Sequence, residues 1–249
     1  MSTADLDAVA PTGTGPERLA RFSRTERALH WTTSILVLTA AVTGMILYTG
    51  PLSGIIGRRV VVKNIHVVAG LAMPVPLVLS YAGRWRDSVR ADVRRLSRWT
   101  RADKFWLRTL GRTGTHQVGK FNAGQKANSA FIVGMIPVMM ATGSVMRWFE
   151  PFPLSWRTGA TFVHDWTAIA TWLVVAGHIF VAFSKPPALW SMVTGWMPAG
   201  WAQRHHPLWA EGEDGPVGEP SVTDDRSREH PAMSTDVAVP DPPVGEHRP

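Results

Sequence analysis

The sequence contains no cysteine among its 249 residues. Without thiols the chain forms no disulfide, holds no iron–sulfur cluster through thiolates and lacks the Cys-x-x-Cys-His motif that attaches c-type haem. Any metal bound here therefore depends on histidine, methionine or carboxylate ligands. The lack of disulfides also means that cysteine usage gives no sign of the compartment.

Charged side chains are scarce as well, at 18% of the chain, and four long stretches have none. The stretches are 31–57, 64–83, 127–146 and 166–184, with lengths of 27, 20, 20 and 19 residues. A helix rises about 1.5 Å per residue, so each stretch is long enough to cross a hydrocarbon core of about 30 Å. The pattern predicts an all-α integral membrane protein.

We expect a four-helix bundle flanked by disordered tails, with no internal repeat. The spans are predicted at 30–50, 62–83, 127–148 and 160–184. Residues 1–20 are small, polar and contain Pro and Gly, and residues 211–249 carry ten Asp and Glu. Such segments bury too little apolar surface to fold, which places the bundle domain at 21–210.

Positive charge gathers between the second and third spans, where residues 83–126 hold twelve Lys and Arg against three Asp. A basic loop between membrane spans is typical of the cytoplasmic side, and this explanation is favoured over nucleic-acid binding. We therefore expect a multi-pass protein of the plasma membrane, with both termini and the 84–126 linker in the cytoplasm. Arginines 90, 94, 98 and 101 recur at helical spacing, which predicts an amphipathic linker helix on the membrane.

Four histidines lie within or at the edge of the spans: His30, His66, His164 and His178. Polar residues are costly in a bilayer and usually functional, although a single one often only packs and hydrogen-bonds. With the first span leaving the cytoplasm, His30 lies near the inner surface, and His66 and His164 lie near the outer surface. His178 follows His164 by fourteen residues, about 21 Å deeper. Two pairs therefore share a depth: His66 with His164, and His30 with His178.

The helical rotation supports the same pairing. Fourteen residues make three full turns plus about 320°, so His164 and His178 project within about 40° of each other. Two ligand pairs on one side of a four-helix bundle are the arrangement for two bis-histidine b-type haems. The inner haem would be held by His30 and His178, and the outer haem by His66 and His164.

Small and basic residues near these histidines fit this interpretation. Glycines are available to make room for a flat macrocycle: Gly70, Gly177, Gly44 and Gly143. Arg27 and Lys63 each precede a histidine by three residues, which makes them candidates for holding haem propionates. Ordinary snorkelling of basic side chains explains them equally well. A methionine ligand stays open, whereas zinc needs three or four ligands at one depth.

Several motifs occur together in this chain. They are Arg27-Ala28-Leu29-His30-Trp31, an early His66, the block Gly119-Lys120-Phe121-Asn122-Ala123-Gly124-Gln125-Lys126 and the His164…His178 spacing. Over residues 20–210 they resemble the cytochrome b (gamma) subunits of respiratory formate dehydrogenases, within the cytochrome b561-like group. Hydrogenase- and thiosulfate-reductase-type cytochromes share the four histidines, and the eight-residue block is the more specific signal for formate dehydrogenase.

The resemblance implies an electron-transfer function. A separate molybdenum- or tungsten-containing subunit oxidises formate, because this chain has no site for that reaction. An iron–sulfur subunit passes the electrons to the outer haem, and the inner haem reduces a quinone (menaquinone or ubiquinone) on the cytoplasmic side. By resemblance, Asn122, Gly124 and Gln125 form the quinone pocket beside His178, since amides can donate to a quinone carbonyl. A cap for the third span is the other interpretation of these residues.

Three other functions stay open. The chain could serve another quinone-linked oxidoreductase, such as a hydrogenase, or act alone as a cytochrome b561-like quinone oxidoreductase with a small oxidant such as superoxide. The third is a haem-free scaffold or transporter, in which the two matched histidine pairs would have to arise by chance. His116, His205 and His206 lie outside the spans, and we expect them on the surface.

Overall fold

The computed structural model describes residues 17–83, 86–112 and 118–212. In these parts of the chain, four helical segments have the length and composition to cross a membrane. They are Arg24–Tyr48, Arg59–Ala82, Ala123–Arg147 and Leu154–Ser184. The predicted all-α membrane bundle is confirmed. Each span begins earlier than predicted, because the helices continue through charged residues, such as Arg157, that interrupt the apolar pattern.

The helices of the bundle are α1 (Arg24–Tyr48), the short α2 (Gly50–Ile56), α3 (Arg59–Ala72), α4 (Pro74–Ala82), α7 (Ala123–Arg147) and α8 (Leu154–Ser184). Met73, between α3 and α4, keeps right-handed helical angles (φ −54°, ψ −41°). Pro74, which has no N–H to donate, therefore interrupts the hydrogen bonding without ending the second span. Pro137 lies inside α7, which continues on both sides of it.

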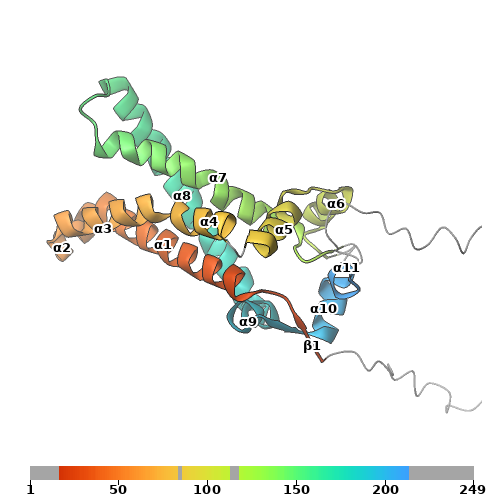
Figure 1. Cartoon of the computed structure of the whole chain (residues 1–249). Helices are drawn as coiled ribbons and strands as arrows, with labels where there is room; N and C mark the ends of the chain where they lie inside the picture. The colour runs from red at the N-terminus through yellow and green to blue at the C-terminus, as the bar shows by residue number, and fades with distance from the viewer. Residues whose placement is uncertain (1–16, 84–85, 113–117, 213–249) are drawn as a thin grey trace, which may run out of the picture. The chain divides into compact units, whose positions relative to one another are not determined.

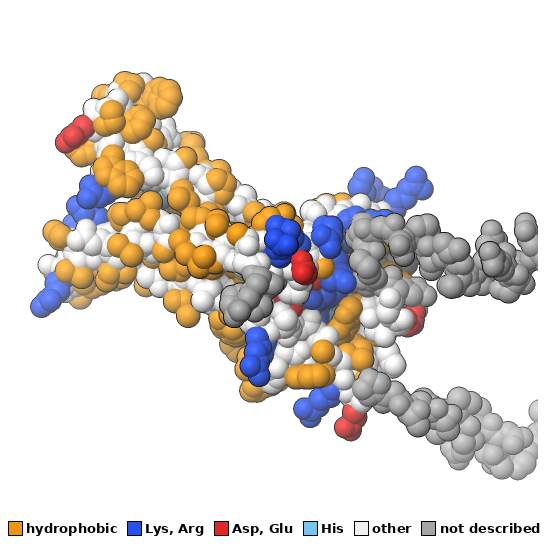
Figure 2. All heavy atoms as spheres, in the orientation of Figure 1, with side chains coloured by type: hydrophobic (Ala, Val, Ile, Leu, Met, Phe, Trp, Pro, Cys, Tyr) orange, Lys and Arg blue, Asp and Glu red, His pale blue; other side chains and the backbone are white. Residues whose placement is uncertain are grey.

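A small apolar core joins α1, α3 and α7. Its buried members are Val37, Ala40, Ala69, Met73, Met135 and Ile136. Many other large apolar side chains of the spans are exposed, and Figure 2 shows them as an orange surface over the bundle. Such a surface is unfavourable in water and is suited to contact with lipid chains.

The described part of the basic linker forms two helices, α5 (Arg86–Ser97) and α6 (Arg101–Thr109), where the sequence predicted one amphipathic helix. The second helix has its own N-terminal cap: the Thr100 hydroxyl accepts from the N–H of Asp103, and the Asp103 carboxylate accepts from the N–H of Thr100. Figure 1 shows α5 and α6 at one end of the bundle and α2 at the other. We call these the linker end and the α2 end.

The chain segments that flank the bundle meet at the linker end. Strand β1 (Arg18–Ala20) pairs antiparallel with β2 (Trp196–Pro198). Up to Gly212, where the described residues end, the fourth span is followed by α9 (Pro186–Thr194), α10 (Ala199–His205) and α11 (Pro207–Ala210). The predicted N-terminal tail, 1–20, therefore includes residues that belong to the fold, because Arg18–Ala20 pair with β2. Residues 1–16 and 213–249 lie outside the described residues, so the disorder of both tails stays a prediction.

Candidate haem sites

The structure brings together both predicted pairs of histidines. In the linker-end pair, the ring centroids of His30 and His178 are 6.2 Å apart and the ring planes are 55° apart. In the α2-end pair, the centroids of His66 and His164 are also 6.2 Å apart, with an interplanar angle of 68°. Helix α8 contributes one histidine to each pair, and their separation of fourteen residues corresponds to about 21 Å along that helix.

This separation fits one metal ion between the two rings of each pair. A histidine nitrogen binds a metal at about 2.0–2.1 Å, and it lies about 1.1 Å from the centre of a ring whose bonds are about 1.33 Å long. Two coaxial imidazoles on one iron therefore have ring centres about 6.3 Å apart. Both pairs have this distance, so the side chains present are suited to bis-histidine ligation.

Hydrogen bonds at the α2 end orient His66 and fix its tautomer. Its Nδ1 lies 2.9 Å from the carbonyl oxygen of Ala40, which can only accept, so Nδ1 carries the proton. The Thr43 hydroxyl lies 3.1 Å from the same nitrogen, and it donates its own proton to the Thr39 carbonyl at 2.6 Å. Thr43 therefore also accepts from His66. The lone pair of Nε2 is left for a metal.

His164 is held in the same way by α7. Its Nδ1 lies 3.0 Å from the hydroxyl of Thr142, which donates to the Val138 carbonyl at 2.7 Å and so accepts from the ring. The Nε2 of His164 is likewise left for a metal. Within the described part of the chain, the structure shows no corresponding hydrogen bond to the ring nitrogens of His30 or His178.

The residue after each threonine is a glycine that makes room for the imidazole. A Cβ atom on Gly44 would lie 3.1 Å from Cε1 of His66, and one on Gly143 would lie 3.3 Å from Cε1 of His164. The two glycines therefore make room for the ligand rings, and their role in making room for a macrocycle stays a prediction. The sequence did not point to Thr43 and Thr142 as partners of the histidines, because threonine is common in membrane helices. Only the rotation of the packed helices brings each hydroxyl to a histidine ring.

The other two glycines leave open space on the helices that carry the ligands. A Cβ atom on Gly70 or Gly177 would meet no heavy atom within 4 Å. Gly70 follows His66 by about one helical turn, and Gly177 directly precedes His178. Both positions are compatible with a flat group next to the histidines.

The two candidates for propionate binding lie in different surroundings. Arg27 reaches α9, where its Nη1 donates to the carbonyl of Val193. Its Nε is buried and has no hydrogen-bond partner among the described residues, so it is a donor suited to a carboxylate. Lys63 is exposed, one turn before His66. The structure thus ties Arg27 to the protein at the linker end and leaves Lys63 at the surface.

The proposed quinone residues form a helix cap. The Asn122 side chain accepts from the N–H of Gln125 at 2.9 Å, and the Gln125 side chain accepts from the N–H of Asn122 at 3.0 Å. Both bonds use amide oxygens, so the two NH₂ groups keep their donor capacity. A Cβ on Gly124 would lie 3.0 Å from the ring of Trp106, which explains the need for glycine there.

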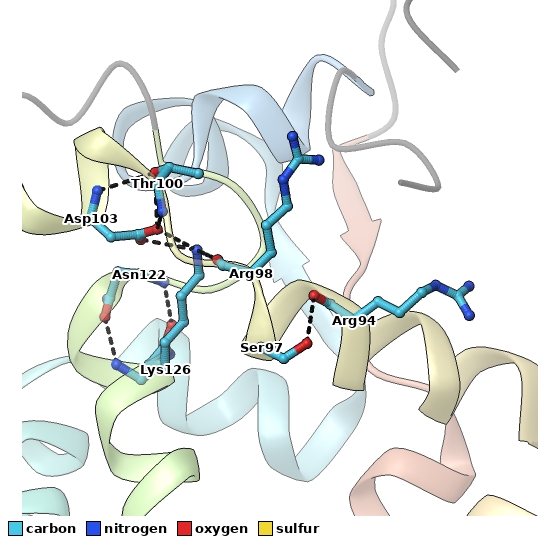
Figure 3. A network of polar contacts seen from close by, with 8 residues as sticks. Arg94, Ser97, Arg98, Thr100, Asp103, Asn122 and Lys126 are labelled. Carbon is cyan, nitrogen blue, oxygen red and sulfur yellow. Dashed lines mark hydrogen bonds and ion pairs between the residues drawn. The ribbon is translucent and has the colours of Figure 1, made fainter. Parts of the chain in front are cut away.

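The lysines of the same block attach the linker helices to the bundle. Lys126 Nζ lies 2.8 and 2.9 Å from the carboxylate oxygens of Asp103 on α6 and 3.0 Å from the carbonyl of Arg98 (Figure 3). Lys120 Nζ lies 2.6 Å from Asp92 Oδ2 on α5. The eight-residue block therefore connects α5 and α6 to the start of α7.

His206 lies in the interior of the linker end, and the expectation of a surface residue is wrong. Only 2% of it is exposed, because α10 and α11 fold back against the block. Its Nδ1 donates to the Gly119 carbonyl at 2.7 Å, and its Nε2 accepts from Arg21 at 3.2 Å. Burial, with the nearby charge of Arg21, lowers the pKa of His206 to about 3. His205 is half-buried and stacks on Trp201, and His116 lies outside the described residues.

Comparison with known proteins identifies the family. The family model for prokaryotic cytochrome b561 matches residues 21–195. The chain belongs to this family. The cytochrome is therefore a multi-pass membrane protein, and its family implies b-type haem, for which the two histidine pairs are suited.

Sequence identity to individual relatives is low. The cytochrome is 24% identical over 203 residues to the formate dehydrogenase cytochrome b556(fdo) subunit of Escherichia coli K12, covering 78% of this chain and 92% of the relative. It is 24% identical over 196 residues to the nitrate-inducible formate dehydrogenase cytochrome b556(Fdn) subunit of the same strain, covering 74% and 86%. The formate dehydrogenase cytochrome b556 subunit of Haemophilus influenzae Rd gives 24% over 203 residues, covering 77% and 82%. The resemblance seen in the sequence motifs is confirmed.

Proposed function

We propose that the cytochrome is the membrane-anchoring, di-haem subunit of a formate dehydrogenase, and that it delivers electrons from an iron–sulfur partner subunit to menaquinone or ubiquinone. Formate oxidation belongs to a separate molybdenum- or tungsten-containing subunit. The observation that carries the proposal is the presence of two histidine pairs with the same centroid distance of 6.2 Å at two levels of α8. A single-haem or haem-free function gives no reason for two matched pairs.

The residues of this chain have distinct roles in the proposal. When bound, the haems supply one-electron carriers, the outer one between His66 and His164 and the inner one between His30 and His178. At the α2 end, the Ala40 carbonyl and the threonine hydroxyls hold the ring protons on Nδ1 and leave Nε2 for iron. Arg27, with its unpartnered Nε, and Lys63 are proposed partners for propionates.

The likeness to the three named formate dehydrogenase subunits supports formate as the source of electrons, since each alignment covers most of both chains. For the quinone, the proposed pocket consists of the amide NH₂ groups of Asn122 and Gln125, the small Gly124 and, as the resemblance implies, His178. The cap geometry supports this role because it fixes both amides by their oxygens.

We place the linker end in the cytoplasm. Figure 2 shows Lys and Arg side chains in blue over the region of α5 and α6. An excess of basic residues in short loops favours retention on the cytoplasmic side. The termini and the linker would then face the cytoplasm, and quinone reduction at this end would take protons from it.

The test is the haem-to-protein ratio of the purified full-length chain, with reduced-minus-oxidised spectra. We expect two b-type haems, falling to one in His66→Ala and staying at two in the control His205→Ala, which alters a histidine outside the spans. In native membranes, formate should reduce the haems. Reduction by hydrogen instead would indicate a hydrogenase-type subunit. Oxidation of a quinol by a small oxidant such as superoxide, catalysed by the isolated chain without partner subunits, would indicate a stand-alone enzyme. A chain without haem would refute the proposal.

A further inference from the structure

A cluster of buried charged side chains lies at the linker end, outside the histidine pairs. We propose that Glu26 and Asp92, bridged by Lys120, form a proton-binding site that supplies a proton for quinone reduction. This inference rests on the proposed function and adds the group that delivers the proton. The site joins three parts of the chain, since Glu26 belongs to α1, Asp92 to α5 and Lys120 to the block before α7.

The geometry is that of two carboxyl groups held by one ammonium. Lys120 Nζ lies 3.0 Å from Glu26 Oε1 and 2.6 Å from Asp92 Oδ2. The two carboxyl groups thus lie next to each other on one ammonium, and this proximity favours a proton on one of them. Asp92 and Lys120 are 7% and 5% exposed, so bulk water does not satisfy these groups. The cluster is therefore built to hold a proton between two acids.

Other charges face the cluster from neighbouring elements. Arg95, one turn along α5, lies 3.0 Å from Asp92 Oδ1, and the buried Arg21 acts on Asp92 through its charge. Burial raises the pKa of Asp92 to about 7, and the neighbouring Glu26 acts in the same direction, while the charge of Lys120 opposes them. Asp92 is thus about half protonated near neutral pH. A proton donor with this pKa can both release a proton and be reloaded.

A surface pocket of about 320 Å³ lies beside the cluster and offers a route for water to Glu26 and Lys120, which line it together with Arg95, Ser88 and others. On the other side, Glu26 precedes His30 by four residues, which puts both on one face of α1. Lys120 lies two residues before Asn122 in the proposed quinone pocket. The cluster therefore lies between the aqueous phase and the end of the bundle where we place quinone reduction.

A quinone takes two electrons and two protons to become a quinol. The Asp92 carboxylic acid breaks its O–H bond and gives one proton to a quinone oxygen, where a new O–H bond forms, and Asp92 becomes a carboxylate. The second proton comes from water. Asp92 regains its proton from water through the pocket and Glu26, and the two electrons come from the electron-transfer function proposed above.

The first test is an infrared titration of the full-length chain in lipid nanodiscs. We expect the carbonyl band of a protonated carboxyl group to titrate near pH 7, and to disappear in Asp92→Asn. The matched control is Asp87→Asn, because Asp87 lies on the same helix with its side chain 92% exposed. Its band should stay as in the wild type. Glu26→Gln removes the partner that shares the proton, and it should shift the titration to lower pH.

The second test follows the reaction itself. The chain is reduced, freed of reductant and mixed with excess decylubiquinone or menadione, and haem reoxidation is measured from about pH 5.5 to 9. We expect the wild-type rate to fall about tenfold per pH unit well above the pKa of Asp92. In Asp92→Asn the rate at pH 6 should fall by about a hundredfold, within the usual range for a positioned proton donor, with no break near pH 7. Asp92→Glu should restore the break.

The outcomes separate the two proposals. Wild-type rates, pH profile and infrared band in Asp92→Asn would overturn the proton site and leave the quinone function intact. Failure of both quinones to reoxidise the wild-type haems would overturn the proposed function itself. Haem content is measured in every variant, and if Asp92→Asn loses haem, the pH profile of Glu26→Gln decides the question, since an unchanged profile there also overturns the site.

Discussion

The two threonine hydroxyls at the α2 end give the sharpest prediction about the histidine pairs. Thr43 and Thr142 each accept a hydrogen bond from Nδ1 of a proposed haem ligand, at 3.1 and 3.0 Å. Valine has nearly the shape of threonine and lacks the hydroxyl. Thr43→Val and Thr142→Val should therefore raise the midpoint potential of the outer haem, because an Nδ1–H that donates makes its imidazole a stronger donor to the ferric iron.

The size of the shift follows from the hydrogen bond that is lost. Such a bond contributes about 1 kcal/mol net, and a tenfold change in equilibrium is about 1.4 kcal/mol or 59 mV for one electron, so the upper limit is about 40 mV per hydroxyl. His66 keeps its bond to the Ala40 carbonyl at 2.9 Å, which reduces the loss in Thr43→Val. We expect about 10–40 mV upward for each variant, and near-additive shifts in the double variant.

The assay is a spectroelectrochemical titration of the purified chain, with the outer haem assigned by its absence in His66→Ala. Thr161→Val is the matched control, because this hydroxyl on α8 bonds to the Arg157 carbonyl of its own helix and is exposed. The inner haem should stay at its wild-type potential in all variants. Equal shifts of both haems, or a downward shift of the outer one, would refute the proposed role of the threonines.

Three further predictions address packing, topology and pH. Gly44→Ala places a Cβ 3.1 Å from an imidazole and should remove the outer haem, whereas Gly54→Ala, with nothing within 4 Å, should retain two haems by the haem-to-protein ratio. Because the chain has no cysteine, single variants report topology: a membrane-impermeant thiol reagent on intact cells should label Ser155→Cys and not Ser97→Cys. The folded pKa of His206, about 3, lies below its ordinary value of 6.5, so the unfolded chain protonates first and stability is lost as pH falls from about 6.5 towards 3, by up to about 1.4 kcal/mol per unit. Thermal melting followed by tryptophan fluorescence should show this slope, and His206→Gln should flatten it.

Much of the bundle could be predicted from the sequence, because charge-free stretches and a fixed rise per residue determine depth. The same arithmetic paired His30 with His178 and His66 with His164 in space. It could not show which side chains support those rings, because that depends on how α1 and α7 are rotated against their neighbours. The Thr-Gly steps became visible only when the helices were in place.

The linker end was harder to predict for a different physical reason. The residues buried there are polar, and polarity in a sequence ordinarily indicates the surface. The burial of Arg21 and His206 is supported by a hydrogen bond between their side chains and by one bond from each to a carbonyl of the block, at Lys120 and Gly119. One signal was available: Thr100 followed three residues later by Asp103 is a capping box, and it marks the start of the second linker helix.

The position of α8 also constrains how the protein is assembled. Each histidine pair takes one member from α8, the last of the four spans. Strand β1, near the beginning of the chain, pairs with β2, which follows α8. A nascent chain with only the first three spans in the membrane thus holds half of each ligand pair and an unpaired first strand. In the proposed di-haem arrangement, haem insertion therefore waits for the fourth span, and a chain that stops before it has neither complete histidine pair.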